Sequence, residues 1–504
     1  MHLGIDLGTT RTIVALHDRG NFPVVGFTRA DGDMVDHYPT VTACVDGALI
    51  HGLDAEAAER EGAPTLRSWK RLLFHTRQDE RITIGEVSMS PVELVTSFLL
   101  ALKRDLLTRS NAAQLITGSL ETVISVPANA HSTQRFVTFD AFRRAGFDVK
   151  AVINEPAAAG LEYAHRHKNT LNSRREHVIV YDLGGGTFDA ALVHIAGGHH
   201  DITLTGGIAE LGGDDFDAQL CAMALERVEQ AFPPNAQQRA DLLRECRAAK
   251  ESIHPNTKRI VLDLEGLGER APEAPVVIPV QEFYDRTRPL VVATLEALDP
   301  IVAALRDEEV IGGELAGIYM VGGATGLPVV PRVVRERFGR RVHRSPSPGA
   351  ATAVGCAILA ATAETQEALS LSERFERHFG VFREAESGTR SIFDPVFTKG
   401  TPMHDGPLVA TRRYRAAHNV GHFRFVESAH VDDHGDPTGD ITPHAEILFP
   451  FASDLVPGTL HTVEIDRLAG EGPLIEERYE VDPAGVIAVT ITNLDQGRGA
   501  RFVL

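Results

Sequence analysis

Cysteine is scarce in this sequence, which has only four among 504 residues. Because Cys44, Cys221, Cys246 and Cys356 form no close pair of the metal-binding or redox kind, we expect a reducing compartment and a cytoplasmic location. Basic residues are also few, since 50 lysines and arginines face 69 acidic residues and leave a net charge of −19. Such a charge repels phosphate backbones and anionic lipids, so we expect neither nucleic acid nor a membrane as partner.

Long hydrophobic runs are lacking as well. The nearest, 350–363, is rich in alanine and about 14 residues long, shorter than the roughly 20 that a bilayer needs, so we predict a buried helix. Residues 1–6 show no basic region, apolar core or cleavage site of a signal peptide, and we expect no export.

The length of the chain, about three times the roughly 150 residues of one domain, predicts two or three packing units.

Strand and helix patterns alternate through the first part of the chain, which predicts an α/β domain over residues 1–363. The apolar runs 122–126 and 178–181 are typical of buried strands. Ser90 is followed by proline and, three residues after it, by glutamate, which predicts a helix that begins at residue 91.

The character of the chain changes after residue 363. A polar, charged segment over 364–377 is interpreted as an interdomain linker or a short exposed helix. Beyond it, short alternating runs such as 423–426, 460–465 and 486–491 are separated by turn residues. This pattern predicts an all-β antiparallel domain over 378–504.

The most informative feature is a motif that occurs twice, as Asp-Leu-Gly-Thr-Thr from Asp6 and as Asp-Leu-Gly-Gly-Gly-Thr from Asp182. Each follows an apolar strand. The glycines let backbone N–H groups approach anionic oxygens, the threonine adds a donor, and the aspartate can hold a hard cation through water. One such turn is weak evidence, but two predict related α/β lobes that face each other and clamp magnesium-bound nucleotide phosphates.

Four further motifs appear in the same order as in a known family: Val126-Pro127-Ala128, Asn154-Glu155-Pro156-Ala157, Gly212-Gly213-Asp214-Asp215-Phe216-Asp217 and Val321-Gly322-Gly323. With the two repeats, they resemble the ATPase domain of the seventy-kilodalton heat-shock (DnaK-type) chaperones over about 360 residues. The repeats alone would also admit actins and sugar kinases, but the second and third motifs are more specific. The resemblance implies a two-lobed, actin-like (ribonuclease-H-like) ATPase fold.

The resemblance continues more faintly toward the end of the chain. Segments 393–402 and 479–489 are similar to the start and end of the family's peptide-binding β-sandwich. The sequence ends at Leu504, where relatives usually continue into a helical lid, so we expect an atypical member with no lid. The implied partners are unfolded or extended client polypeptides, a J-domain co-chaperone and a nucleotide-exchange factor.

The resemblance also assigns roles to residues. The catalytic set would be Lys70, Glu155, Asp182 and Thr187. Magnesium would be held through water by Asp6, Asp182 and Asp189. ATP or ADP would be bound by Gly8, Thr9, Thr10, Arg11, Gly184, Gly185, Gly186, Gly212, Gly213, Lys250, Gly322 and Gly323. Pro127 and Arg135 would couple nucleotide state to the second domain.

The adenine side of the predicted site departs from the family pattern. Arg247 stands for a glutamate, His254 for a serine, Gly326 for a base-stacking arginine and Gly349 for an acid. We therefore expect weaker or less base-selective nucleotide binding than is usual in the family.

The linker also departs from the family pattern, in which an acidic residue is followed by three or four leucines. Here only Leu369 and Leu371 are present, in a polar context, and this places the coupling between domains in question.

Three functional hypotheses follow. The first is an ATP-dependent chaperone in which slow ATP hydrolysis drives the binding and release of extended protein segments. The second is a nucleotide-sensing scaffold or assembly factor with one dedicated protein partner and little turnover, which the altered linker favours. The third, a small-molecule kinase of the same superfamily, does not explain the C-terminal β domain.

Overall fold

The structure is a computed structural model, and it describes residues 1–74, 80–128, 130, 132–167, 175–196, 198–228, 234–265, 274–307, 315–362, 370–386, 390–403, 408–432, 434–482 and 485–504. The chain forms two compact units. The first contains Met1–Asn129, Phe142–Val149 and Ile153–Leu371, and the second contains Ala130–Ala141, Lys150–Val152 and Ser372–Leu504. Residues 364–369 of the predicted linker, Leu369 included, lie outside the described residues, and its described part begins with strand β20 (Ser370–Arg374). The predicted domain boundaries stay predictions.

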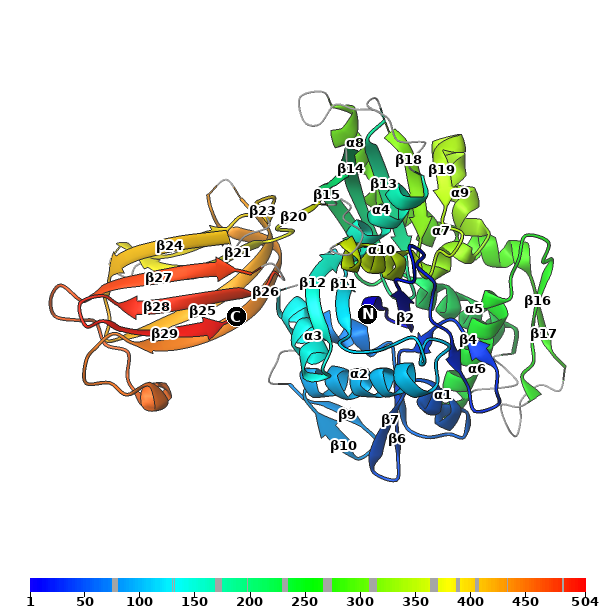
Figure 1. Ribbon diagram of the computed structural model, residues 1–504, viewed down its shortest axis with the longest axis horizontal. Helices are drawn as coiled ribbons and strands as arrows, with labels where there is room; N and C mark the ends of the chain where they lie inside the picture. Colours follow the sequence, from blue (N-terminus) through cyan, green and yellow to red (C-terminus); the bar gives the residue numbers. More distant parts are fainter. Residues whose placement is uncertain are drawn as a thin grey trace. The chain divides into compact units, whose positions relative to one another are not determined.

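The first unit contains a mixed sheet in which β11, β1, β2 and β5 follow one another in this order. Figure 1 labels β11 and β2 of this sheet. Its strands are β1 (His2–Leu7), β2 (Arg11–Leu16), β5 (Tyr38–Pro39) and β11 (Glu121–Val126). β1 runs parallel to β11 and antiparallel to β2, with Asp6 opposite Ile13. We call this the β1 sheet.

A second mixed sheet has the order β19, β18, β13, β14, β15, and we call it the β13 sheet. Its strands are β13 (His177–Leu183), β14 (Phe188–Ala196), β15 (His199–Ile208), β18 (Leu315–Val321) and β19 (Val342–Arg344). β13 is parallel to β18 and antiparallel to β14, which is the arrangement that β1 has with β11 and β2. The repeated motif therefore occupies the same place in two sheets of the same local topology.

Smaller elements complete the first unit. Its short strands are β3 (Phe27–Thr28), β4 (Met34–Val35), β6 (Val41–Val45), β7 (Ala48–His51), β8 (Thr65–Arg67), β9 (Ile82–Ile84), β10 (Val87–Met89), β16 (Arg259–Leu262) and β17 (Val276–Pro279). Its helices are α1 (Gly52–Arg60), η1 (Trp69–Phe74), α2 (Pro91–Thr108), α4 (Glu155–Arg166), α5 (Gly213–Val228), α6 (Ala236–Glu251), α7 (Val280–Ala297), α8 (Asp299–Arg306), η3 (Gly323–Gly326), α9 (Val329–Phe338), η4 (Gly339–Arg341) and α10 (Ala351–Ala360). Three elements, α3 (Ser132–Arg144), β12 (Asp148–Asn154) and β20 (Ser370–Arg374), are divided between the units.

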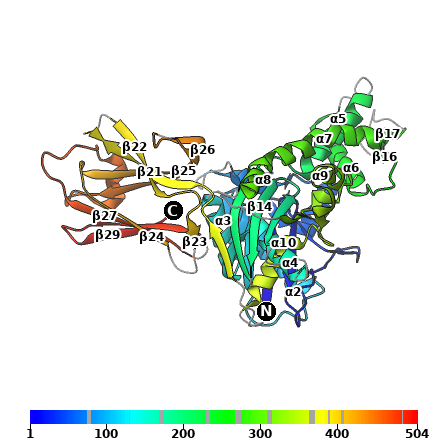
Figure 2. The same ribbon diagram turned by 90° about the horizontal axis from the view of Figure 1, so that it is seen from above.

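Several predicted elements are confirmed. Ser90 caps α2 through a capping box with Glu93, as the sequence indicates. The predicted buried helix is α10, and the predicted strands are β11 and β13. Figure 2 shows α5, α6, α7 and α9 gathered beside β16 and β17, where their apolar faces form one core with the β13 sheet.

Two helices cross very closely at the centre of the first unit. A methyl group built on Gly355 of α10 would lie 1.8 Å from the carbonyl oxygen of Ala158 on α4. Only glycine allows this approach, and α10 also packs on β1. The crossing holds the start of α4, and with it Glu155, next to the β1 sheet.

The second unit contains two antiparallel sheets, with the orders β22, β21, β25, β26 and β24, β27, β28, β29. The strands are β20 (Ser370–Arg374), β21 (His378–Ala385), β22 (Arg390–Phe397), β23 (Pro402–Met403), β24 (Leu408–Arg415), β25 (Val420–Val431), β26 (Pro437–Pro450), β27 (Leu474–Val481), β28 (Ile487–Asn493) and β29 (Arg498–Val503). Inward-facing residues of both sheets share one hydrophobic core. The coarse prediction of an α/β part followed by an antiparallel β part is therefore confirmed.

One predicted strand is wrong. Residues 460–465 alternate in polarity, but the structure places Leu460 in a 3₁₀ turn, η6 (Pro457–Thr462). The turn runs through Thr462, so local backbone bonding outweighs the alternation at Leu460, His461 and Thr462. Within the described parts of the chain, no helix has both the length and the apolar character needed to cross a membrane.

Candidate functional site

A cavity of about 620 Å³ in the first unit is lined by both copies of the repeated motif. Asp6 near the end of β1 and Asp182 near the end of β13 both border it. The two turns also touch each other, because a methyl group on Gly185 would lie 2.5 Å from Thr10 Oγ1. The fold thus brings the two motifs together around one space.

Most of the predicted nucleotide-binding residues line this cavity. They are Gly8, Thr9, Thr10, Arg11, Gly184, Gly185, Gly213, Lys250, Gly322 and Gly323. Gly186 and Gly212 do not line it and lie behind its wall, where the Gly212 N–H donates to Asp215 Oδ2 at 2.7 Å. Of the four departures from the family pattern, Arg247, Gly326 and Gly349 line the cavity and His254 does not.

Lys70 and Glu155 form a buried ion pair on the cavity wall. Lys70 Nζ lies 2.7 Å from Glu155 Oε1, and both side chains are at least nine-tenths buried. Burial alone would lower the pKa of Lys70, but the charges of Glu155 and Asp6 outweigh burial and raise it. Glu155 is the first residue of α4, where the helix N-terminus favours a carboxylate. The ammonium therefore stays charged.

Three aspartates surround this pair. Burial, and next to it the charge of Glu155, raises the pKa of Asp6 and of Asp189 to about 7. The same two causes raise the pKa of Asp182 above its ordinary value. Asp189 does not line the cavity but lies directly opposite Asp182 in the β13–β14 pair. The cluster around Lys70 thus holds more carboxylates than this one ammonium can neutralise.

This excess of carboxylate oxygen suits a magnesium ion. Magnesium prefers oxygen ligands and usually keeps several of its waters. Among the residues that the structure describes, no group of three or more side chains is close enough to form a direct metal site. Asp6, Asp182 and Asp189 therefore fit an ion held through water and through phosphate oxygens, as the resemblance implies.

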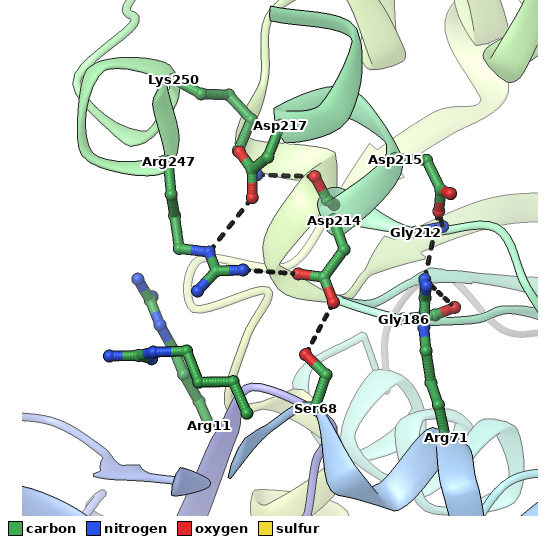
Figure 3. A network of polar contacts seen from close by, with 12 residues as sticks. Arg11, Ser68, Arg71, Gly186, Gly212, Asp214, Asp215, Asp217, Arg247 and Lys250 are labelled. Carbon is green, nitrogen blue, oxygen red and sulfur yellow. Dashed lines mark hydrogen bonds and ion pairs between the residues drawn. The ribbon is translucent and has the colours of Figure 1, made fainter. Parts of the chain in front are cut away.

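A polar network closes the cavity on its α5–α6 side (Figure 3). Arg247 Nη2 lies 3.1 Å from Asp214 Oδ1, and its Nε lies 3.1 Å from Asp217 Oδ2. Lys250 Nζ lies 2.7 Å from Asp217 Oδ1. Ser68 donates to the other oxygen of Asp214 at 2.7 Å. Arg247 and Lys250 therefore hold two helices together and have their charges neutralised by the protein.

Arg71 is a residue whose role the sequence analysis missed. Its Nη2 donates to the Gly186 carbonyl at 2.6 Å and lies 3.1 Å from Asp215 Oδ2 (Figure 3). Arg71 follows Lys70 on η1, so one short turn supplies the buried ammonium and fixes the second glycine turn. The only available signal was its position next to Lys70.

The two residues predicted to couple the domains lie outside the cavity. Pro127 follows β11 and is buried. Arg135 of α3 is buried, and its Nη1 donates to the Val152 carbonyl at 2.9 Å. Within the second unit its Nη2 lies 3.5 Å from Glu373 Oε2. Their proposed role in coupling stays a prediction.

Comparison with known proteins gives consistent matches. Residues 74–371 match a family described as Hsp70 protein. Chaperone protein DnaK of Thermosipho africanus is 27% identical over 100% of this chain and 79% of its own length, and that of Thermotoga petrophila is 28% identical over 100% and 80%. A chaperone protein HscA homolog of Bordetella pertussis is 33% identical over 71% of this chain and 57% of its own length.

Proposed function

The chain belongs to the Hsp70 family, and on that premise we propose that it is an ATP-dependent chaperone of the DnaK type. Members of this family are ATPases that bind ATP and ADP and act on client polypeptides. Slow hydrolysis of ATP to ADP and phosphate in the cavity of the first unit would switch the second unit between holding and releasing extended protein segments. The first unit would have the two-lobed, actin-like fold of the family, and the second unit its β-sandwich.

One observation carries this proposal. The buried Lys70–Glu155 pair stands on the wall of a cavity that both glycine turns and both aspartates, Asp6 and Asp182, line. Glycine turns offer backbone N–H groups to phosphate oxygens, and Thr187 adds a hydroxyl. This set of groups suits the positioning and charge neutralisation that phosphoryl transfer requires.

Each catalytic residue would have a defined task. Lys70, held in its charged form, would stabilise the negative charge on the transferring phosphoryl group. Glu155 would orient a water molecule for attack on the terminal phosphorus and accept a hydrogen bond from it. Magnesium, when bound, would neutralise phosphate charge. As the water oxygen bonds to phosphorus, the bond from phosphorus to ADP breaks.

Client binding would belong to the second unit. The edge strands of its two sheets are β22, β26, β24 and β29. An extended segment can add to such an edge through main-chain hydrogen bonds, with little demand on its sequence. A J-domain co-chaperone and a nucleotide-exchange factor are the further partners that we propose. The four cysteines, all of which lie among the described residues, form no disulfide with one another, which supports the proposed cytoplasmic location.

Phosphate release from magnesium ATP tests the proposed activity. We expect slow release by the wild type, release at background by Lys70→Ala, and wild-type release by Lys258→Ala, whose lysine is exposed and outside the cavity. A fluorescent unfolded polypeptide should bind the protein more tightly with ADP than with ATP. Equal background rates for the wild type and Lys70→Ala would instead favour the nucleotide-sensing scaffold.

A further inference from the structure

Among the described residues, five cationic side chains line the cavity, and the protein neutralises four of them. Their partners are Glu251 for Arg11, Glu155 for Lys70, Asp214 and Asp217 for Arg247, and Asp217 for Lys250. Arg344 differs, because its exposed side chain has no ion pair or hydrogen bond to any described residue. A guanidinium left free inside a ligand cavity is available to the ligand.

The position of Arg344 on the β13 sheet defines which part of a nucleotide it can reach. β13, β18 and β19 are parallel, so their carboxyl ends open on the same edge, where ligands of α/β sheets bind. Asp182 lies near the end of β13, and Arg344 ends β19, with β18 between them. Two strand spacings of roughly 4.8 Å place their backbones about 10 Å apart. If the terminal phosphates lie at Asp182, the base end of an extended nucleotide lies near Arg344.

The surroundings of Arg344 suit a flat aromatic ring. A methyl group built on Gly326 would lie 3.4 Å from Arg344 Nη2, so the guanidinium covers a position that has no side chain of its own. Nearby in the chain, Leu327 and Pro346 also line the cavity, and both are apolar. A guanidinium can stack on a ring face, and apolar walls favour the same ligand.

We propose that Arg344 holds the nucleotide by stacking its guanidinium on the base. This inference rests on the proposed nucleotide-binding function and names a residue that contributes to nucleotide affinity. Stacking recognises the face of a ring and not the polar groups at its edge, so Arg344 strengthens the binding of ATP and GTP alike. A contact with phosphate, or a side chain that only faces solvent, is the alternative that the experiment must separate.

The experiment measures, by calorimetry with magnesium, the affinity of the full chain for ATP, GTP and inorganic tripolyphosphate. Arg344→Ala should weaken ATP and GTP binding about two- to tenfold and leave tripolyphosphate binding unchanged. Arg344→Lys, which keeps the charge without the planar group, should lie between Arg344→Ala and the wild type. The matched control is Arg340→Ala, an exposed arginine of η4 that does not line the cavity.

Three results would overturn the inference. Unchanged ATP affinity in Arg344→Ala would make Arg344 a solvent-facing side chain. An equal loss of tripolyphosphate binding would show that Arg344 contacts the phosphate groups and not the base. Full retention of ATP affinity by Arg344→Lys would show that charge, and not stacking, is what matters. If the wild type bound none of the three ligands, the proposed function itself would fail, which is a result distinct from the other three.

Discussion

Replacing Asp6 with asparagine should stabilise the magnesium-free protein, and more strongly at pH 8 than at pH 5. Burial, and next to it the charge of Glu155, raises the pKa of Asp6 to about 7 from an ordinary value of 3.8. The native state therefore holds this proton more tightly than the unfolded chain does. It follows that the free energy of unfolding falls as the pH rises from about 4 through 7. Asparagine has nearly the same shape and cannot ionise, so it removes this loss.

The magnitude follows from the difference between the two pKa values. The rise from 3.8 to about 7, at about 1.4 kcal/mol per pH unit, amounts to about 4 kcal/mol, of which about 3 kcal/mol is lost between pH 5 and pH 8. Asp182 and Asp189 belong to the same cluster, and the cavity admits water, so this figure is a ceiling. We expect the advantage of Asp6→Asn to grow by about 1–2 kcal/mol between these two pH values.

Urea unfolding in the presence of a chelator, at pH 5 and at pH 8, measures this advantage. The control is Asp46→Asn, which replaces an exposed carboxylate in a turn far from the cavity and should have the same small effect at both pH values. Adding magnesium ATP should stabilise the wild type more than Asp6→Asn. An advantage that is equal at both pH values, or a variant less stable than the wild type at pH 8, would refute the reasoning.

Two further predictions concern ion pairs, one in the second unit and one at the cavity. Glu477 is buried in the core of the second unit and accepts hydrogen bonds from both Nη atoms of Arg383, so Glu477→Gln should cost about 3 kcal/mol in urea unfolding. Glu476→Gln, on the opposite face of β27 and paired with the exposed Arg413, should cost less than about 1 kcal/mol. Glu251→Gln breaks a half-exposed ion pair with Arg11 across the cavity. Release of fluorescent ADP should therefore become faster by at most about fivefold. Because salt screens exposed charges, 0.5 M salt should abolish the difference between the variant and the wild type.

The shared cavity could be predicted from the sequence because its parts are local and repeated. A strand that ends in aspartate and a glycine turn is a signal contained within a few residues, so two copies indicated two equivalent strands. The structure places both in sheets of matching topology, with Asp6 and Asp182 on one cavity. The start of α2 at Ser90 was predictable for the same reason, since its cap lies within four residues.

What escaped prediction depends on residues far apart in the chain. Arg71 and Arg344 are single arginines in unremarkable segments, and only the fold decides that one meets Gly186 and the other meets no partner among the described residues. The same limit applies to Glu477, which alternation places on the core face of β27 with Ile475 and Tyr479. The strand alone does not reveal that Arg383 lies across from this buried carboxylate.

The distribution of charge in the cavity also bears on how the departures from the family pattern should affect nucleotide binding. Arg247 and Lys250 are neutralised by aspartates of α5, so they add little net attraction for a ligand. Around Lys70 the carboxylates are in excess, and a bare polyphosphate would be repelled. Affinity must then come from a divalent cation at the phosphate end and from stacking at the base end. We expect a site built in this way to bind magnesium nucleotides with little regard for the polar edge of the base, which is the weak selectivity that Arg247 and Gly326 predict.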